Sequence, residues 1–320
     1  MEKKTCIYII LAVAALATVA CKKDDSSSSD SKPSLLGLGF DLRPFGRIGD
    51  TYNLSPRGLY ASDASTPSGV TYSWQLNTGT RDTTDLFTYT ASSVRLDTLK
   101  CYAAADGYYS TSATQVISII DPTLGKTLTG TGINATDAHV VDARSLPTGE
   151  NTYYYTQAAG LDWFRNNLAY TGAGVAYENA EVTSYVLGRY YTWEEAQTAC
   201  PEGWRLPTDE EWAALGDTAG ELMAADVAFS GTKMWEYWPE MKVETSDKYH
   251  LAAIPAGYAL TGGMSPSFKG IQNYAMFWTA TSSTEDGNMA LYRYIHVKEP
   301  KVLSTYGDKH SLALSVRCVR

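Results

Sequence analysis

The sequence predicts a mixed fold of two domains, an all-β sandwich followed by an α+β domain. Three observations predict it. The chain has 320 residues, which is more than one compact core usually holds. Short stretches of strand composition, separated by turn-rich clusters, follow one another through residues 33–122. Two helix starts lie back to back between Tyr190 and Trp212, in the second half of the chain.

Residues 1–20 have the composition of a secretory signal peptide. Two lysines precede an apolar run at residues 6–20, which is too short to span a bilayer comfortably. Cys21 follows Thr18-Val19-Ala20, which resembles a bacterial lipobox, although threonine stands where leucine is usual. We therefore expect Cys21 to be lipidated and to anchor the protein in a membrane. The alternative is ordinary cleavage that leaves Cys21 as an unpaired thiol.

Residues 21–32 are expected to form a polar tether behind the lipid. Two lysines and two aspartates follow the cysteine, and a serine-rich run then reaches Ser31 with no apolar residue to pack. Acidic residues at this place resemble the signal that sends Bacteroidetes lipoproteins to the outer face of the outer membrane. We therefore expect an exported lipoprotein of the outer membrane that faces the cell exterior.

Residues 33–122 are expected to form the β-sandwich. The predicted strands are residues 51–54, 70–76, 86–90, 98–104 and 115–120. Five strands at this spacing suggest a sandwich of about ninety residues. Residues 69–74 resemble the central strand of a PKD or immunoglobulin-like module, with Trp74 as its core aromatic, and such modules usually act as spacers. Cys101 is expected to be a buried thiol within a strand.

Residues 123–150 read as a linker and entry segment, and residues 151–320 as the α+β domain. Two Ser/Thr-x-x-Glu capping boxes predict where its helices begin. In such a box the hydroxyl accepts a free backbone N–H of the first helical turn, and the glutamate carboxylate accepts the N–H of the cap residue. The boxes pair Thr192 with Glu195 and Thr208 with Glu211. The first helix is expected to stop near Pro201, and the second to start after Pro207. Further expectations are a helix at 222–229 and strands at 152–156, 251–255, 275–278, 290–294 and 312–319.

The segment CPEGWRLPTDEEW at residues 200–212 resembles the Fibrobacter succinogenes major paralogous domain. Residues 253–258, 277–281, 291–294 and 315–320 match further segments in the family's order. That family is similar in turn to the C-type-lectin-like and sulfatase-modifying-factor folds. The resemblance implies a C-type-lectin-like domain at 151–320, a cell-surface setting and little about chemistry. It implies a core built from the signature residues Trp193, Trp204, Leu206, Pro207, Trp212, Trp278 and Arg317.

The five cysteines predict one disulfide. Cys6 leaves with the signal peptide, Cys21 carries lipid, and Cys101 belongs to the first domain, so Cys200 and Cys318 remain. Two cysteines in one domain of an exported protein most often pair. The long loop that they would close gives a stabilisation of about 4–5 kcal/mol. The alternative is that one of them is a reactive thiol, since sulfatase-modifying enzymes depend on cysteine and metal chemistry.

Charge and motif composition argue against several functions. The net charge of −9 and the pI near 5.0 argue against nucleic acid as a partner. The four histidines are scattered without metal-ligand spacing, and no phosphate-binding loop or nucleophile elbow is present. We expect no metal, no cofactor and no catalytic residue. Residues 299–301 read Glu-Pro-Lys where calcium-dependent lectins carry Glu-Pro-Asn or Gln-Pro-Asp, so a calcium site of that kind is not expected.

The aromatic content points to binding. The chain has 23 tyrosines and 8 tryptophans, whose rigid amphipathic rings suit sugars and proteins. We expect a non-catalytic binding or adhesive lipoprotein whose partner is a glycan or a surface protein. Trp235, Tyr237 and Trp238 are the candidate ligand contacts, and the alternative for these three is packing in the core. The other functions that stay open are a structural subunit of a surface appendage or nutrient-uptake complex, and an enzyme related to sulfatase-modifying factors with an unrecognised site.

Overall fold

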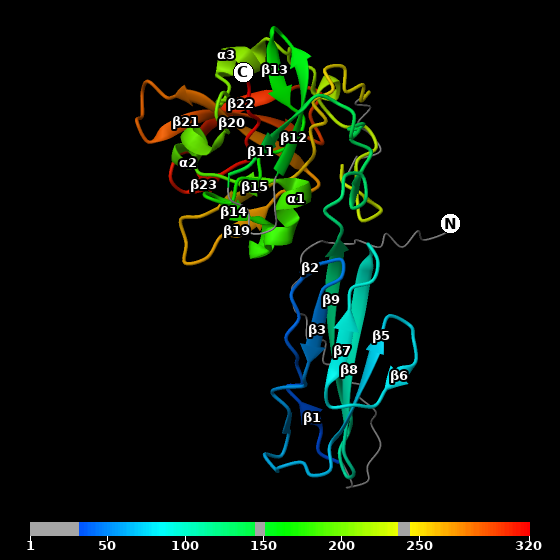
Figure 1. Ribbon diagram of the computed structural model, residues 1–320. Helices are drawn as coiled ribbons and strands as arrows, with labels where there is room; N and C mark the ends of the chain where they lie inside the picture. Colours follow the sequence, from blue (N-terminus) through cyan, green and yellow to red (C-terminus); the bar gives the residue numbers. More distant parts are fainter. Residues whose placement is uncertain (1–31, 145–150, 236–243) are drawn as a thin grey trace, which may run out of the picture. The chain divides into compact units, whose positions relative to one another are not determined.

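The computed structural model describes residues 32–144, 151–235 and 244–320 (Figure 1). The chain divides into two compact units between Ile119 and Ile120, called unit 1 and unit 2 below. The predicted signal peptide and the predicted lipidation site, Cys21, lie outside the described residues.

Unit 1 is built of β-strands. Its largest sheet has five strands in the order β2-β9-β8-β5-β6, and two smaller sheets pair β1 with β4 and β3 with β7. The strands are β1 (Leu35–Leu36), β2 (Phe45–Arg47), β3 (Thr51–Leu54), β4 (Tyr60–Ala61), β5 (Thr71–Leu76), β6 (Arg81–Asp82), β7 (Phe87–Thr90), β8 (Leu96–Ala104) and β9 (Thr111–Ile120). The five strands predicted here are confirmed, although β8 and β9 begin two and four residues earlier than predicted.

The core of unit 1 forms around Trp74 on β5. Its ring lies 5.0 Å from that of Phe40 and 5.5 Å from that of Phe87 on β7, measured between centroids. The large sheet and the β3–β7 pair therefore share one apolar interior. Cys101 is buried there as a free thiol, as predicted, and burial raises its pKa to about 12.

In the described part of unit 2, the structure is mainly β, with three short α-helices. The helices are α1 (Ser184–Leu187), α2 (Trp193–Ala199) and α3 (Asp209–Ala213). The strands of the first half are β10 (Leu128–Thr129), β11 (His139–Asp142), β12 (Asn151–Ala158), β13 (Leu161–Phe164), β14 (Val175–Ala176), β15 (Arg189–Tyr190), β16 (Ala228–Phe229) and β17 (Thr232–Lys233). Those of the second half are β18 (Tyr258–Leu260), β19 (Ser267–Lys269), β20 (Tyr274–Ser282), β21 (Met289–His296), β22 (Leu303–Asp308) and β23 (Leu312–Ala313).

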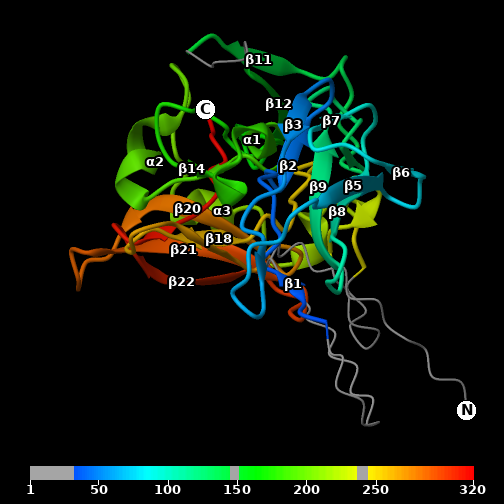
Figure 2. The ribbon, with the colours of Figure 1, turned by 90° about the horizontal axis from the view of Figure 1, so that it is seen from below.

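These strands form several small sheets. The main ones have the orders β20-β21-β22, β19-β18-β23 and β11-β12-β13. Figure 2 shows β20, β21 and β22 beside β18, and a backbone bridge between Gly257 and Ala275 joins these two groups of strands. The core of unit 2 lies beneath them and contains Trp278 on β20 and Tyr191 before α2.

Both capping boxes are present. The Thr192 hydroxyl accepts the backbone N–H of Glu195, and the Glu195 carboxylate accepts the N–H of Thr192 at 2.8 Å. Thr208 and Glu211 repeat the arrangement at α3. Helix α2 ends at Cys200, just before Pro201, as predicted.

The predicted helix at 222–229 is wrong. The buried apolar residues of this segment would not lie on one face of a helix. They are Leu222, Met223, Ala224 and Val227. Residues 222–224 instead pair with Ala253, and Ala228–Phe229 forms a hairpin with β17.

Two predicted strands of unit 2 are also wrong. Residues 251–255 do not form a strand, because Ala252 has a positive φ of 49° and Ala253 makes a single bridge. The predicted strand at 312–319 is regular only at β23. Beyond it, residues 314–319 make single bridges to four different segments.

Candidate functional site

The signature residues from the sequence lie in or beside the core of unit 2. Trp204, Leu206, Pro207, Trp212, Trp278 and Arg317 are buried, and Trp193 is half-buried. The Trp193 indole N–H donates to the Thr279 carbonyl, and that of Trp278 donates to the Tyr191 carbonyl, both at 2.8 Å. These contacts fix α2 against β20, which gives the signature a structural role.

Arg317 is a buried cation held by neutral oxygens. It donates to the carbonyls of Phe164 and Leu251 at 3.0 and 2.6 Å, and to the side-chain oxygen of Asn167 at 2.7 Å. Desolvation lowers its pKa to about 9, which still leaves the guanidinium charged at neutral pH. Arg317 therefore ties three separate segments together from inside the core.

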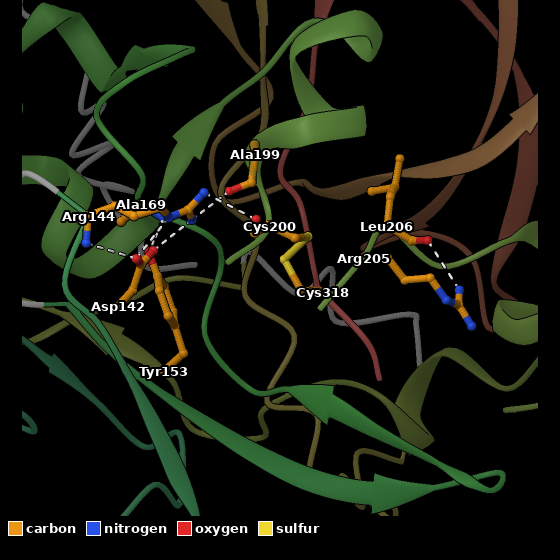
Figure 3. The surroundings of a disulfide bond; sticks show 9 residues. All are labelled: Asp142, Arg144, Tyr153, Ala169, Ala199, Cys200, Arg205, Leu206 and Cys318. Atoms are coloured by element: carbon orange, nitrogen blue, oxygen red, sulfur yellow. Dashed lines mark hydrogen bonds and ion pairs between the residues drawn. A yellow bond between two sulfur atoms is a disulfide. The ribbon is translucent and has the colours of Figure 1, made fainter. Parts of the chain in front are cut away.

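The predicted disulfide between Cys200 and Cys318 is confirmed (Figure 3). Arg144 supports it, since its guanidinium donates to the carbonyls of Ala199 and Cys200 at the end of α2. The same guanidinium makes paired bonds of 2.9 and 2.7 Å to the Asp142 carboxylate. Because both sulfurs are bonded, this place offers no thiolate for nucleophilic chemistry.

The predicted ligand contacts need correction. Trp235 is buried, with 3% of its surface exposed, so it does not form a surface contact. The residue directly follows the β16–β17 hairpin, where the neighbouring Met234 is buried as well. Tyr237 and Trp238 lie outside the described residues.

A different aromatic surface lies on the sheet β20-β21-β22. It is an open groove of about 400 Å³, which we call the tyrosine groove. Its lining consists of Tyr258, Tyr274, Met276, Tyr292, Tyr294, His296, Glu299, Leu303 and Leu312.

Strand register brings these side chains together. Side chains alternate between the two faces of a strand, so residues two apart share a face. Tyr292, Tyr294 and His296 therefore lie in a row on β21, and β20 places Tyr274 opposite His296 and Met276 opposite Tyr294. The other face of the sheet carries Phe277 and Ile295, which are buried.

The rings form a connected cluster. Tyr274 stacks on His296 with 4.4 Å between ring centroids, and its ring lies 6.3 Å from those of Tyr258 and Tyr294. Tyr292 continues the row, 5.8 Å from Tyr294. Contacts of this kind hold each ring in place, so the groove is largely pre-formed.

The four groove tyrosines, Tyr258, Tyr274, Tyr292 and Tyr294, are half-buried, and their hydroxyls make no hydrogen bond within the described part of the chain. Core tyrosines behave differently. The Tyr190 hydroxyl donates to the Ala256 carbonyl at 2.6 Å, and that of Tyr191 donates to the Tyr170 carbonyl at 2.9 Å. Buried polar groups normally find such partners, so unpaired hydroxyls that reach solvent are available to a ligand.

The groove is close to neutral. Desolvation, together with nearby tyrosines, raises the pKa of Tyr292 to about 12, so its phenol stays protonated at neutral pH. Desolvation and the Lys298 charge lower the pKa of His296 below 6.5. Glu299 is the one carboxylate among the lining residues and is exposed.

The sequence contains a signal for this groove that the prediction did not use. Tyr292 and Tyr294 alternate along the predicted strand at 290–294, and His296 continues the alternation just beyond it, which places three aromatic rings on one face. Tyr274 and Met276 alternate in the same way. Their meeting depends on the pairing of β20 with β21, which local pattern does not fix.

Among residues 32–144, 151–235 and 244–320, no group of three or more His, Cys, Asp or Glu side chains is placed to hold a metal ion. In the same ranges, no helix has the length and apolar character needed to cross a membrane.

Comparison with known proteins identifies the family of the chain. No curated protein matches the chain. The model of the Fibrobacter succinogenes major domain matches residues 131–320, which is more than half of the chain and contains the capping boxes, the disulfide and the tyrosine groove. The chain therefore belongs to the Fibrobacter succinogenes major domain family.

Proposed function

We propose that unit 2 is a non-catalytic binding module that holds a glycan in the tyrosine groove. The observation that carries this proposal is the set of four half-buried tyrosines with unpaired hydroxyls around a groove of about 400 Å³. Aromatic faces stack against the C–H groups of a sugar ring, while phenol hydroxyls exchange hydrogen bonds with sugar hydroxyls. The near-neutral lining favours an uncharged sugar over an ionic ligand.

The proposal includes the setting of the protein. Lipid at Cys21 and the polar tether would hold the chain on the outer face of the outer membrane. Unit 1, as a PKD or immunoglobulin-like spacer, would raise unit 2, as a C-type-lectin-like domain, above that surface. Support for this setting comes from the sequence of residues 1–32 and from the β-strand architecture of unit 1.

The test is a glycan-array screen of the purified full chain, followed by calorimetry with the sugar that binds best. Tyr294→Ala removes one ring of the groove and should weaken binding roughly tenfold, which corresponds to about 1.4 kcal/mol. Tyr294→Phe keeps the ring and removes the hydroxyl, which should cost about fivefold, or about 1 kcal/mol.

Tyr306→Ala is the matched control. Tyr306 lies on β22 with 51% of its surface exposed, and its partner in the sheet is Leu291, whose side chain points away from the groove. This variant should bind as the wild type does. Equal binding by Tyr294→Ala and the wild type would refute the groove as the site. If the chain binds no glycan but binds a surface protein, unit 2 would instead be a protein-binding module or a structural subunit.

A further inference from the structure

Unit 1 contains a second hollow, separate from the tyrosine groove. It lies over β5, β8 and β9, has a volume of about 410 Å³ and is lined mostly by hydroxyl-bearing side chains. We call it the arginine groove, after its single charged lining residue, Arg81.

The hollow follows from the sequence of the outer sheet face. Trp74 and Cys101 point into the core, so their neighbours Ser73 and Tyr102 point outward, and Ser112 lies opposite Tyr102 on β9. Ser73 and Ser112 are small, which leaves space on both sides of the Tyr102 ring. The Tyr102 ring thus lies at the bottom of the groove, between small polar side chains.

Arg81 is held over that ring. Its guanidinium carbon lies 3.5 Å from the centre of the Tyr102 ring, a close cation–π contact. The Tyr102 ring is fixed in turn, because its hydroxyl donates to the Gln75 side-chain oxygen at 2.9 Å. Within the described residues the Arg81 guanidinium makes no hydrogen bond and no ion pair, so its N–H donors are oriented but unused.

Arg81 is the one charged residue of the lining, and the Asp85 carboxylate lies within electrostatic range of Tyr72, another lining residue. None of the lining residues carries a carboxylate. Lys100 is on the same face of the sheet, opposite Gln75, and adds a second cation. The nearest acid in sequence, Asp82, pairs with Trp74 and so lies on the other face.

We propose that the arginine groove binds an acidic sugar, with the carboxylate on Arg81 and the sugar hydroxyls on the surrounding serines and threonines. A guanidinium presents parallel N–H donors that match the two oxygens of a carboxylate. The hydroxyl-rich walls are suited to a polyol. This site does not depend on the tyrosine groove.

The experiment is calorimetry of the full chain with the trisaccharide of galacturonic acid and with the neutral galactose trisaccharide. We expect the acidic sugar to bind at least about tenfold more tightly, since a hydrogen bond to a charged group contributes most of the difference. Binding should weaken as salt is added, because the partners are exposed. Equal binding of both sugars by the Tyr294→Ala chain, in which the tyrosine groove is weakened, or no binding of the acidic sugar, would overturn the proposal.

Variants locate the site. Arg81→Gln removes the charge from an exposed residue, which keeps the fold, and should abolish the preference for the acidic sugar. Arg57→Gln is the control, because Arg57 is also exposed in unit 1 but pairs with Asp41 outside the groove. The preference should survive in Tyr294→Ala, which alters only unit 2. A sulfated galactose trisaccharide that bound more tightly than the carboxylated one would overturn the assignment of a carboxylate.

Discussion

Removing the disulfide should destabilise unit 2 by a predictable amount. Cys200 and Cys318 are 118 residues apart, and the chain-entropy model gives about 5 kcal/mol for a closed loop of that length. Alanine at both positions removes the covalent link without leaving a lone thiol. The variant should be less stable because its unfolded state gains conformational entropy, since the disulfide restricts the unfolded chain more than the folded one.

Urea unfolding followed by tryptophan fluorescence is the appropriate assay. Trp74 is the single tryptophan of unit 1, so seven of the eight report on unit 2. With a denaturant slope of about 2 kcal/mol/M, the midpoint should fall by about 2.5 M. Reduction of the wild type with dithiothreitol should give the same midpoint as the double variant.

Cys101→Ala provides the control, since Cys101 is a free thiol in unit 1. Its unit 2 transition should match that of the wild type. A double variant that loses less than about 1 kcal/mol would refute the loop-entropy reasoning, and would mean that the unfolded chain is already compact without the link.

Three further predictions concern other residues. Arg317→Met should destabilise unit 2 by about 3 kcal/mol or more, measured in the same assay, because the carbonyls of Phe164 and Leu251 lose their donor; a neutral result would show that they find other partners. The pKa of His296 is lowered in the folded state, so protonation of this histidine favours the unfolded state. The folded protein should therefore lose stability as the pH falls below about 6.5, the ordinary pKa of histidine. His296→Gln should reduce the loss of stability between pH 8 and pH 5. An unchanged difference between the two pH values would argue against this assignment. Cys21→Ser should abolish incorporation of labelled palmitate and release the protein from membranes, and membrane retention of this variant would contradict the anchor.

The sequence predicted the features whose interactions are local. The capping boxes at Thr192 and Thr208 depend on residues three positions away, and both were predicted correctly. The helix at 222–229 failed because a short apolar run does not distinguish a helix from a buried extended segment. The tyrosine groove was missed because it needs the pairing of Tyr274 with His296 across a hairpin. The sequence leaves Trp235 open between a ligand contact and core packing, and its burial in the structure decides for the core.

The single bridges of residues 314–319 have a consequence for how unit 2 assembles. Leu314 bonds to Tyr191, Ser315 bridges to Phe277, and Val319 bridges to both Trp163 and Arg205. Since this segment closes pairings with partners that lie up to 156 residues earlier, no smaller portion of unit 2 contains a complete interior. Contacts this distant in sequence make folding slow and all-or-none. A chain cleavage or a deletion within 314–319 should therefore unfold the whole of unit 2 and make it sensitive to proteases, and the effect should not be confined to one strand.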